Sequence, residues 1–397
     1  MCHPRAVKSL IWHEITITLP ARPPSGSHTA VHYPANAPRA VFKNHALNTM
    51  RIHNLLSRMA VVALASVACS PILADTTAVR FINDWKWEGQ AAPLLLSLDE
   101  GYFTEESLDV SLEIGKGSLD ALPKVASGEF DMGSADINSL ITWRHKHPDE
   151  DMKAVYMIYN VPPFAVLGRR SLGVTGPHDL EGHTLGAPAF DGAYAQWPAF
   201  VIANGILDKR VTIEDVSFPE REAKLASGEV DAITGFSFTS YIALLNKGVP
   251  DSDISLMLMS DFGLDLYGNA IIVNPDFARE NPGAVKAFLR AAVRGYQATI
   301  ANPSAAVEHV LSRNEDPDRE TELKRLIMAI GHHIVTEEVL ATGLGGVIEG
   351  RLDKSIAQLA SIHDFSSLPA ANDIFDASYL PTIASRMVAD PAAVDAQ

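Results

Sequence analysis

The chain has 397 residues, of which 47% are hydrophobic and 20% charged, which is typical of a globular protein with two or three domains. The first 74 residues contain 7 Lys/Arg and one acidic residue, so residues 75–397 carry a net charge of −22. A body this acidic argues against nucleic acid or an anionic membrane surface as a partner, because both are bound through clustered Lys and Arg. Both cysteines, Cys2 and Cys69, precede the body, which excludes disulfides, thiol nucleophiles and Cys-based metal sites from it.

The N-terminal segment has the pattern of an export signal. Residues 1–49 show no periodicity and are interpreted as an extension upstream of the true start at Met50. The apolar run Met59–Ala68 follows a basic stretch and is too short to span a bilayer as a helix. Residues 50–74 are therefore predicted to be a secretory signal peptide, and the processed protein is expected in the periplasm. A partial lipobox leaves lipidation of Cys69 open as an alternative.

Strand and helix patterns alternate from Val79 onward. Strands are predicted at Val79–Ile82, Leu108–Ile114, Phe130–Ser134 and Met152–Ile158, and helices at Ala91–Glu100, Ser118–Ser127 and Asp136–Lys146. Ser118 is placed as the N-cap of the second helix because Ser favours that position. The βαβα order predicts a parallel sheet with helices on both faces.

A short internal repeat indicates two similar lobes. Ala126–Asp131 has the sequence ASGEFD, and Ala226–Asp231 has ASGEVD one hundred residues later. Both segments follow a helix and enter a short apolar strand, and the Gly fits the left-handed position that ends many helices. Chance is the alternative, since helix–Ser–Gly–strand connections are common, but a near match over six residues in equivalent settings favours two lobes.

The remaining elements complete this division. Strands are predicted at Thr184–Ala187, Val230–Gly235 and Gly268–Asn274, and helices at Pro282–Ala301, Pro303–Ser312, Asp318–Ile330 and Thr336–Gly343. The late helices would cover the first lobe. The prediction is therefore a discontinuous lobe 1 of residues 78–165 and 268–397, with lobe 2 at residues 166–267.

Three stretches resemble a known family. They are Asp84–Phe103 (DWKWEGQAAPLLLSLDEGYF), Leu108–Asp136 and Asp179–Asp191 (DLEGHTLGAPAFD). They are similar to periplasmic solute-binding proteins of ABC importers, in the nitrate/sulfonate/taurine and thiamine-pyrimidine-precursor group. The resemblance implies an α/β, two-lobed type II periplasmic binding protein. Each lobe would be a mostly parallel sheet flanked by helices. Ligand would be held in the cleft between the lobes and passed to an ABC permease, by a protein acting as a monomer.

Ligands of open parallel sheets bind beyond the carboxyl ends of the strands, which nominates five loops. Those loops contain aromatic rings and carboxylates, only two lysines and no arginine. The predicted ligand-binding residues are Asp84, Trp85, Trp87, Gly117, Ser118, Asp136, Pro188, Asp191, Trp197, Phe236, Ser237, Tyr267 and Asn269. Aromatic rings with a few carboxylates suit a flat heteroaromatic or amine-bearing ligand. A sulfonate or nitrate would need basic groups or a helix N-terminus, which Gly117 and Ser118 leave open.

Simpler roles compete for several of these residues. Trp197 has helical spacing with Phe200 and fits a core position equally well. Asp84 and Asp136 fit helix caps, a role compatible with ligand contact. The pair His332-His333 lacks a third ligand at helical spacing, so no metal or cofactor site is predicted.

The family also includes a pyrimidine synthase of thiamine biosynthesis, which is the enzyme alternative. That enzyme has a His before the Pro of its first helix and a Cys-rich run before its return crossing. This chain has Gln90-Ala91-Ala92-Pro93 and Phe262–Ala270 (FGLDLYGNA) in the comparable places. An effector domain of a DNA-binding regulator would need an upstream helix-turn-helix, for which residues 1–74 offer no pattern. The sequence therefore predicts a binding protein that catalyses no reaction.

Overall fold

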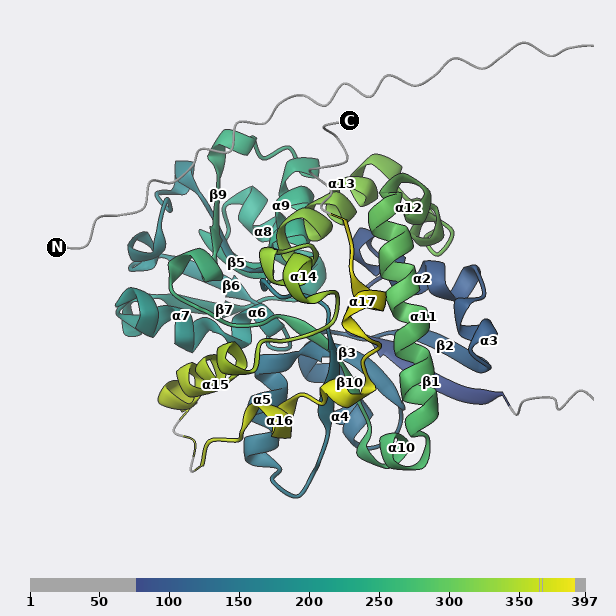
Figure 1. The fold of residues 1–397 in the computed structure, drawn as a ribbon. Helices are drawn as coiled ribbons and strands as arrows, with labels where there is room; N and C mark the ends of the chain where they lie inside the picture. The colour runs from purple at the N-terminus through teal and green to yellow at the C-terminus, as the bar shows by residue number, and fades with distance from the viewer. Residues whose placement is uncertain (1–75, 364, 366, 390–397) are drawn as a thin grey trace, which may run out of the picture. The chain divides into compact units, whose positions relative to one another are not determined.

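The computed structural model describes residues 76–363, 365 and 367–389. The predicted signal peptide, the extension before it and Cys69 lie outside these residues. Within the described part, no helix combines the length and apolarity needed to cross a membrane. The described elements form two five-stranded sheets with flanking helices, drawn to the right and left of Figure 1.

The first sheet has the strand order β2-β1-β3-β10-β4. Its strands are β1 (Thr77–Asn83), β2 (Leu108–Ile114), β3 (Met132–Asp136), β4 (Lys153–Met157) and β10 (Asn269–Val273). Strands β1, β2 and β3 are parallel, and β10 runs antiparallel to both β3 and β4. This sheet therefore takes its fourth strand from a segment more than one hundred residues later in the chain.

The second sheet repeats this arrangement, with the order β7-β6-β8-β5-β9. Its strands are β5 (Phe164–Arg169), β6 (Thr184–Ala187), β7 (Thr212–Asp215), β8 (Ala232–Phe236) and β9 (Ile254–Leu258). Strands β6, β7 and β8 are parallel, and β5 is antiparallel to β8 and β9. The predicted α/β architecture of two mostly parallel sheets is confirmed.

Helices flank both sheets. Before the last strand of the second sheet they are α2 (Ala92–Asp99), α3 (Tyr102–Glu105), α4 (Ser118–Ala126), α5 (Ile137–Lys146), α6 (Gly192–Ala195), α7 (Trp197–Asn204), α8 (Phe218–Ser227) and α9 (Ser237–Asn246). After the second sheet come α10 (Pro275–Glu280), α11 (Pro282–Ala301), α12 (Pro303–Leu311), α13 (Arg319–Ala329), α14 (Glu337–Thr342), α15 (Glu349–His363), α16 (Ala371–Ile374) and α17 (Ile383–Arg386).

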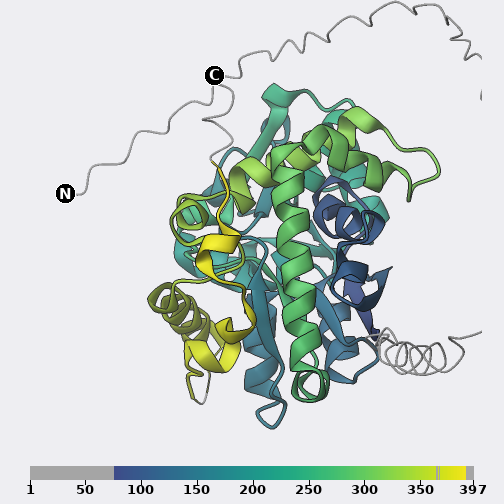
Figure 2. The same cartoon turned by 45° about the vertical axis from the view of Figure 1, so that its right-hand side comes forward.

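The longest helix anchors the first lobe. Helix α11, the long green helix of Figure 2, packs against α2, α3 and β2. Phe288 of α11 stacks on Phe81 and Phe103 with ring centroids 5.4 and 4.8 Å apart, and all three rings are buried. Burial of such aromatic surface is the main stabilising term for this face of the sheet.

The repeated hexapeptide performs the same task in both lobes. Gly128 and Gly228 end α4 and α8 with φ of 76° and 82°. Three residues later, the Asp131 carboxylate accepts from the Arg80 backbone N–H in β1, and Asp231 accepts from that of Thr184 in β6. Each aspartate directly precedes the central strand of its sheet, β3 or β8, and ties the start of that strand to its neighbour, β1 or β6.

Two chain crossings join the lobes, at residues 158–163 and 264–268. They are hydrogen-bonded to each other, since Gly268 N–H donates to the Tyr159 carbonyl. A Cβ on Gly268 would lie 2.9 Å from the Tyr159 Cβ, so the close approach of the two crossings requires glycine there. Motion of one lobe against the other has to pass through this pair of segments.

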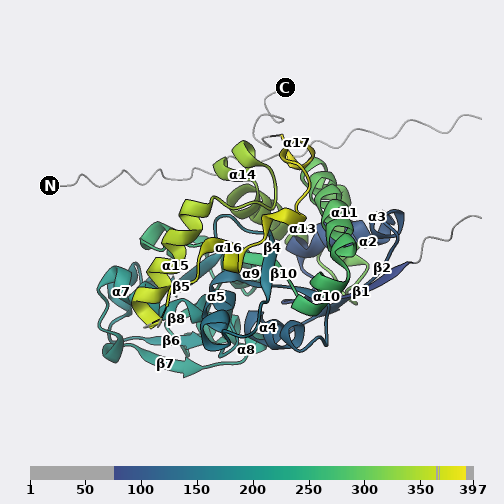
Figure 3. The same cartoon turned by 60° about the horizontal axis from the view of Figure 1, so that its bottom comes forward.

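The structure corrects one predicted cap and adds elements. Gly117, not Ser118, is the N-cap of α4; the Ser118 hydroxyl is instead bonded to Asp84 and Asp136. Strands β5, β7 and β9 were not predicted, and neither was α15. Helix α15 packs on α5 of the first lobe and α7 of the second (Figure 3).

Candidate ligand-binding site

A cavity lies between the two lobes at the carboxyl ends of β1 and β8, and we refer to it as the cleft cavity. It is lined by Asp84, Trp85, Gly117, Ser118, Asp191, Gly192, Phe218, Arg221, Phe236 and Thr239. The first four belong to the first lobe and the other six to the second. The rings nearly fill it, leaving about 30 Å³, room for about two water molecules. A ring-sized ligand therefore has to move these side chains or the lobes that hold them.

Asp84 is a carboxylate buried among neutral donors. Ser118 and Ser134 hydroxyls and the Asn269 amide donate to its oxygens at 2.9, 3.0 and 2.6 Å. Burial raises the pKa of Asp84, although these three hydrogen bonds oppose the shift. No cation is paired with Asp84 among the described residues. A ligand N–H reaching this carboxylate would supply its missing charge-assisted partner.

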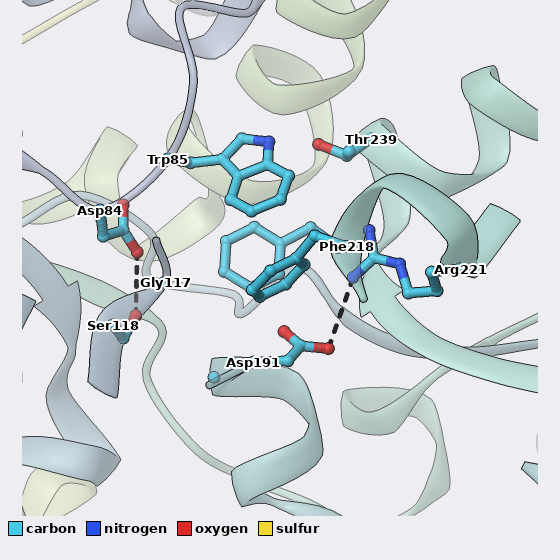
Figure 4. Close-up of a pocket in the computed structure, with 10 residues that line it drawn as sticks. Asp84, Trp85, Gly117, Ser118, Asp191, Phe218, Arg221 and Thr239 are labelled. Atoms are coloured by element: carbon cyan, nitrogen blue, oxygen red, sulfur yellow. Dashed lines mark hydrogen bonds and ion pairs between the residues drawn. The ribbon is translucent and has the colours of Figure 1, made fainter. Parts of the chain in front are cut away.

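Aromatic rings from both lobes meet over the cavity. The ring of Trp85 contacts Phe218 edge-on, with centroids 4.6 Å apart, and Figure 4 shows the two rings between the acidic groups. Phe236 contributes a third ring, packed on Phe164. Because Trp85 and Phe218 already touch, a flat ligand inserted between them must displace one of the two rings by about the thickness of an aromatic ring, ~3.5 Å.

The second lobe contributes a buried charge cluster. The Arg221 guanidinium donates to Glu222 at 2.5 Å and lies 3.6 Å from Asp191. Burial disfavours the charged guanidinium, but Glu222 and Asp191 outweigh it and raise the pKa of Arg221. The pKa of Asp191 is raised by burial, in spite of Arg221 and the hydrogen bond from Thr234. Arg221 is therefore already neutralised by its own lobe.

Glu88 ties the first-lobe ring to the second lobe. Its carboxylate accepts from the Trp85 indole N–H at 3.2 Å and from the Thr239 hydroxyl at 3.0 Å. Arg325 of α13 lies 3.8 Å away on the same carboxylate. One side chain thus fixes both the orientation of the stacking ring and a contact across the cleft.

A second cavity adjoins the first behind Trp85. Its lining includes Asn83, Asp84, Trp85, Ser134, Tyr159, Phe236, Asn269 and Tyr296. Asp84, Trp85 and Phe236 line both cavities, so the two are separated only by these side chains. The Asn269 Oδ1 is buried there and has no hydrogen-bond partner, which makes it an available acceptor.

Seven of the predicted site residues line one or both of these cavities. They are Asp84, Trp85, Gly117, Ser118, Asp191, Phe236 and Asn269. Asp136 lies just behind Ser118, as the N-cap of α5. The carbonyl of Pro188 closes the turn before Asp191. Ser237 is buried and bonded to His333 at 2.8 Å.

The other three predicted residues have packing roles in this arrangement. Trp87 packs against the core of the first lobe, and Trp197 is buried with its indole N–H on Asp208. Tyr267 is buried at the return crossing, where its hydroxyl donates to Glu338 at 2.6 Å. None of the three lines either cavity.

Four lining residues are absent from the sequence prediction: Gly192, Phe218, Arg221 and Thr239. The five nominated loops contain no arginine, and Arg221 reaches the cavity from inside α8 rather than from a strand end. The internal repeat was the feature of the sequence that could have identified these residues, because it makes α8 the counterpart of α4. Ser217 caps α8 as Gly117 caps α4, so the first turn of α8 faces the cleft as that of α4 does.

No group of three or more His, Cys, Asp or Glu suited to a metal ion occurs in the part of the chain that the structure describes. The site therefore offers aromatic surfaces, buried carboxylates and one neutralised guanidinium. Aromatic surfaces suit stacking on a flat molecule, and buried carboxylates suit hydrogen-bond donors.

Comparison with known proteins points to one family. A family model described as "NMT1/THI5 like" matches residues 88–306, more than half of the chain. The formylaminopyrimidine-binding protein of Halalkalibacterium halodurans is 28% identical, over 68% of this chain and 80% of that protein. The riboflavin-binding protein RibY of Chloroflexus aurantiacus is 25% identical over 55% of this chain and 61% of that one. The 4-amino-5-hydroxymethyl-2-methylpyrimidine phosphate synthase of Aspergillus parasiticus is 25% identical over 59% of this chain and 70% of the enzyme.

Solved structures agree on the fold. The alkanesulfonate-binding protein SsuA from Xanthomonas axonopodis pv. citri superposes with a TM-score of 0.59. It is 13% identical, and the match covers 76% of this chain and all of that one. The predicted two-lobed binding-protein architecture is confirmed by this likeness.

Proposed function

This chain belongs to the NMT1/THI5-like family, and we propose that it is the substrate-binding protein of an ABC importer for a small nitrogen-bearing heteroaromatic compound. The thiamine-pyrimidine-precursor type of ligand, such as formylaminopyrimidine, is the leading candidate. The observation that carries the proposal is Asp84, a buried carboxylate with no cationic partner among the described residues, beneath the Trp85 ring. A pyrimidine with an exocyclic amine can stack on the Trp85 ring and at the same time donate an N–H hydrogen bond to Asp84.

The relatives support this class of ligand. The two named binding proteins take formylaminopyrimidine and riboflavin, which are both flat and rich in ring nitrogen. The enzyme-named relative is 25% identical, but its family's His before the first-helix Pro and its Cys-rich run have no counterpart here. We therefore assign binding and delivery, with no reaction of its own.

Arg221 favours a sulfonate or nitrate at first sight, because an anion needs a buried cation. Two observations weigh against that alternative. Glu222 and Asp191 already surround the guanidinium, and Asp84 faces the same cavity. An anion placed there would meet one positive group and three carboxylates, an arrangement that costs binding energy in a buried site.

The proposed mechanism is capture by closure. Trp85 presents its face from the first lobe, and Phe218 and Phe236 close on the ligand from the second. A ligand that contacts both lobes binds the closed form better and shifts the population toward it. The crossings at residues 158–163 and 264–268 act as the hinge. A permease then receives the ligand from the protein, which is exported through its predicted signal peptide at residues 50–74.

The first experiment identifies the ligand. Small molecules released from the purified, heat-denatured protein are analysed by mass spectrometry, and calorimetry then compares formylaminopyrimidine, riboflavin and taurine. We expect formylaminopyrimidine or a close analogue to bind most tightly. Taurine binding with no response to the pyrimidine would contradict the proposal.

Asp84→Asn tests the chemistry of the site. Loss of the carboxylate weakens an N–H···O⁻ bond, so we expect the affinity for the pyrimidine to fall roughly tenfold, for about 1.5 kcal/mol. Ser118→Ala, which removes a neutral partner of Asp84 and keeps its charge, is the matched control and should have a smaller effect. Equal or tighter binding by Asp84→Asn would indicate an anionic ligand instead. Melting temperatures of both variants show whether either change disturbs folding.

A further inference from the structure

A third cavity lies on the other side of the α5 N-terminus from the cleft, and we refer to it as the α5 cavity. It is lined by Leu119 and Leu122 of α4, by Ser139, Thr142, Trp143 and Lys146 of α5, by Ala195 and Gln196 of the second lobe, and by His363 of α15. Its volume of about 220 Å³ is several times that of the cleft cavity.

The walls of the α5 cavity are apolar over most of their area. Leu119 and Trp143 pack against the core, and Leu122 is fully buried. An apolar cavity of ~150 Å³ is enough to hold benzene inside a protein, so a cavity of 220 Å³ has room for a two-ring molecule.

One polar group in this wall lacks a partner. Gln196 is 2% exposed, and its Nε2 donates to Asp136 at 2.9 Å. That bond fixes the amide orientation, because an oxygen in the same place would face a carboxylate oxygen. The Gln196 Oε1 is left buried with no hydrogen-bond partner. A buried, unsatisfied acceptor costs free energy, which a donor in the cavity would recover.

The cavity is connected to the ligand site through buried groups. Gln196 donates to Asp136, the Asp136 backbone N–H donates to the Ser118 hydroxyl at 3.0 Å, and Ser118 donates to Asp84 at 2.9 Å. The first of these bonds joins the second lobe to the first. One chain of hydrogen bonds therefore connects a wall of the α5 cavity to Asp84 in the cleft cavity.

We propose that the α5 cavity is a second small-molecule site, which takes a flat, apolar one- or two-ring molecule with an N–H or O–H donor. The ring lies against Leu119 and Trp143, and its donor bonds to the Gln196 Oε1 after a small shift of the side chains that bury it. The site is separate from the cleft in lining residues and in ligand chemistry, since its polar contact is a neutral acceptor rather than a carboxylate. Its existence does not depend on the ligand proposed for the cleft.

The test uses 5-fluoroindole, a two-ring probe with one N–H donor, followed by ¹⁹F NMR. We expect the full-length protein to broaden the probe signal in a saturable way. Ala195→Phe fills the cavity and should abolish the effect, whereas Ala301→Phe, on the exposed end of α11, should leave it intact. Gln196→Leu is similar in size but removes both the Oε1 acceptor and the Nε2 bond to Asp136, and should weaken probe binding about fivefold.

Two results would overturn the proposal. One is the absence of saturable broadening with the unaltered protein. The other is probe binding that persists unchanged in Ala195→Phe, which would place the probe in the cleft or on the surface. Circular dichroism melting of each variant confirms that it is folded before the comparison is made. Because the probe is not the cleft ligand, failure here leaves the proposed transport function standing, and the reverse is also true.

Discussion

Gly117 shows how closely the lobes approach at a single residue. Its φ of 107° lies where side chains are strained, and a Cβ there would be 2.4 Å from the Phe190 carbonyl oxygen of the other lobe. Glycine is thus required twice, once for the backbone at the start of α4 and once for closure.

Gly117→Ala should therefore impair both stability and closure. We expect unfolding to become easier by about 1–3 kcal/mol from the backbone strain. Ligand affinity should fall at least tenfold, because the added methyl group holds the lobes apart. Gly283→Ala, at an open position in the first turn of α11, is the control and should change neither value by much. Calorimetry measures the change in ligand affinity and urea denaturation the change in stability. Unchanged ligand binding by Gly117→Ala would show that the close contact between Gly117 and Phe190 is not needed in the bound form.

Asp136 makes stability depend on pH. Burial raises its pKa from 3.8 to about 6, although hydrogen bonds from Ser139 and Asn138 favour the charged form. The folded state thus holds a proton that the unfolded state has lost between pH 4 and 6. Stability from this residue is complete below pH 4 and is lost as the pH rises through about 6.

Asp136→Asn isolates this contribution. The free energy of unfolding of the unaltered protein minus that of the variant should fall by about 3 kcal/mol between pH 4 and pH 7. Using the difference cancels the titration of other groups. Urea denaturation at several pH values supplies the curve, and a difference that stays flat would show that Asp136 keeps an ordinary pKa.

At the scale of elements, the repeated helix–Gly–Asp–strand unit sets each sheet. The Asp131 carboxylate also pairs with the Arg80 guanidinium, but the Arg80 side chain is 51% exposed, so that ion pair contributes little. What Asp131 and Asp231 share is the bond to a backbone N–H of the neighbouring strand, β1 in the first sheet and β6 in the second.

Asp131→Ala and Asp231→Ala should therefore destabilise the protein by similar amounts, about 1–2 kcal/mol each, because each leaves one strand N–H without its partner. Asp276→Ala removes an exposed aspartate that is paired with Arg279, and should have almost no effect. Denaturation curves for the three variants decide the matter. A much larger loss for Asp131→Ala would mean that its ion pair carries the stability instead.

These elements also show what the sequence could predict. Leu108–Ile114, Thr184–Ala187 and Pro282–Ala301 match the observed elements at both ends, because alternating or continuous periodicity is bounded there by Gly, Pro or loop residues. Strand β7 was missed because its four residues are largely exposed, so hydrophobic alternation is lacking. Arg221 was missed for a different reason. It extends into the cleft from a helix, whereas the sequence argument considered only loops at the carboxyl ends of strands.

The sequence alone does not distinguish the aromatic residues that line the cleft from those that belong to the core, because tertiary contacts set the orientation of each ring. Trp85 and Trp197 are both large rings next to predicted loops. The Trp85 indole is held over the cleft by Glu88, whereas that of Trp197 is turned into the second lobe by Asp208. Both anchors are carboxylates, one three residues and the other eleven residues later in the chain, and neither orientation follows from local pattern.

At the scale of the two lobes together, closure links the cleft to the α5 cavity. Both are bounded by residues of each lobe, and the Gln196–Asp136 bond crosses between them. A ligand that closes the cleft should bring the α5 walls together as well. By linkage, each ligand then changes the affinity of the other by the same factor.

We therefore expect formylaminopyrimidine to tighten 5-fluoroindole binding about fivefold or more, and the reverse titration to give the same factor. Gln196→Leu should reduce this coupling, because it removes the bond between the lobes. ¹⁹F NMR and calorimetry measure the two directions independently. Equal probe affinity with and without the pyrimidine would show that the two cavities act separately.

The late return of the chain to the first sheet has a consequence for the order of folding. Strand β10 lies between β3 and β4, yet it follows them by more than one hundred residues, so Val273 pairs with Met132. During synthesis the second lobe has all five of its strands by residue 258, while the first sheet still lacks its fourth strand. Long-range pairing of this kind closes slowly. The first sheet, whose lobe carries Asp84 and Trp85, is thus the later of the two to receive all its strands, and the cleft cannot be complete before then.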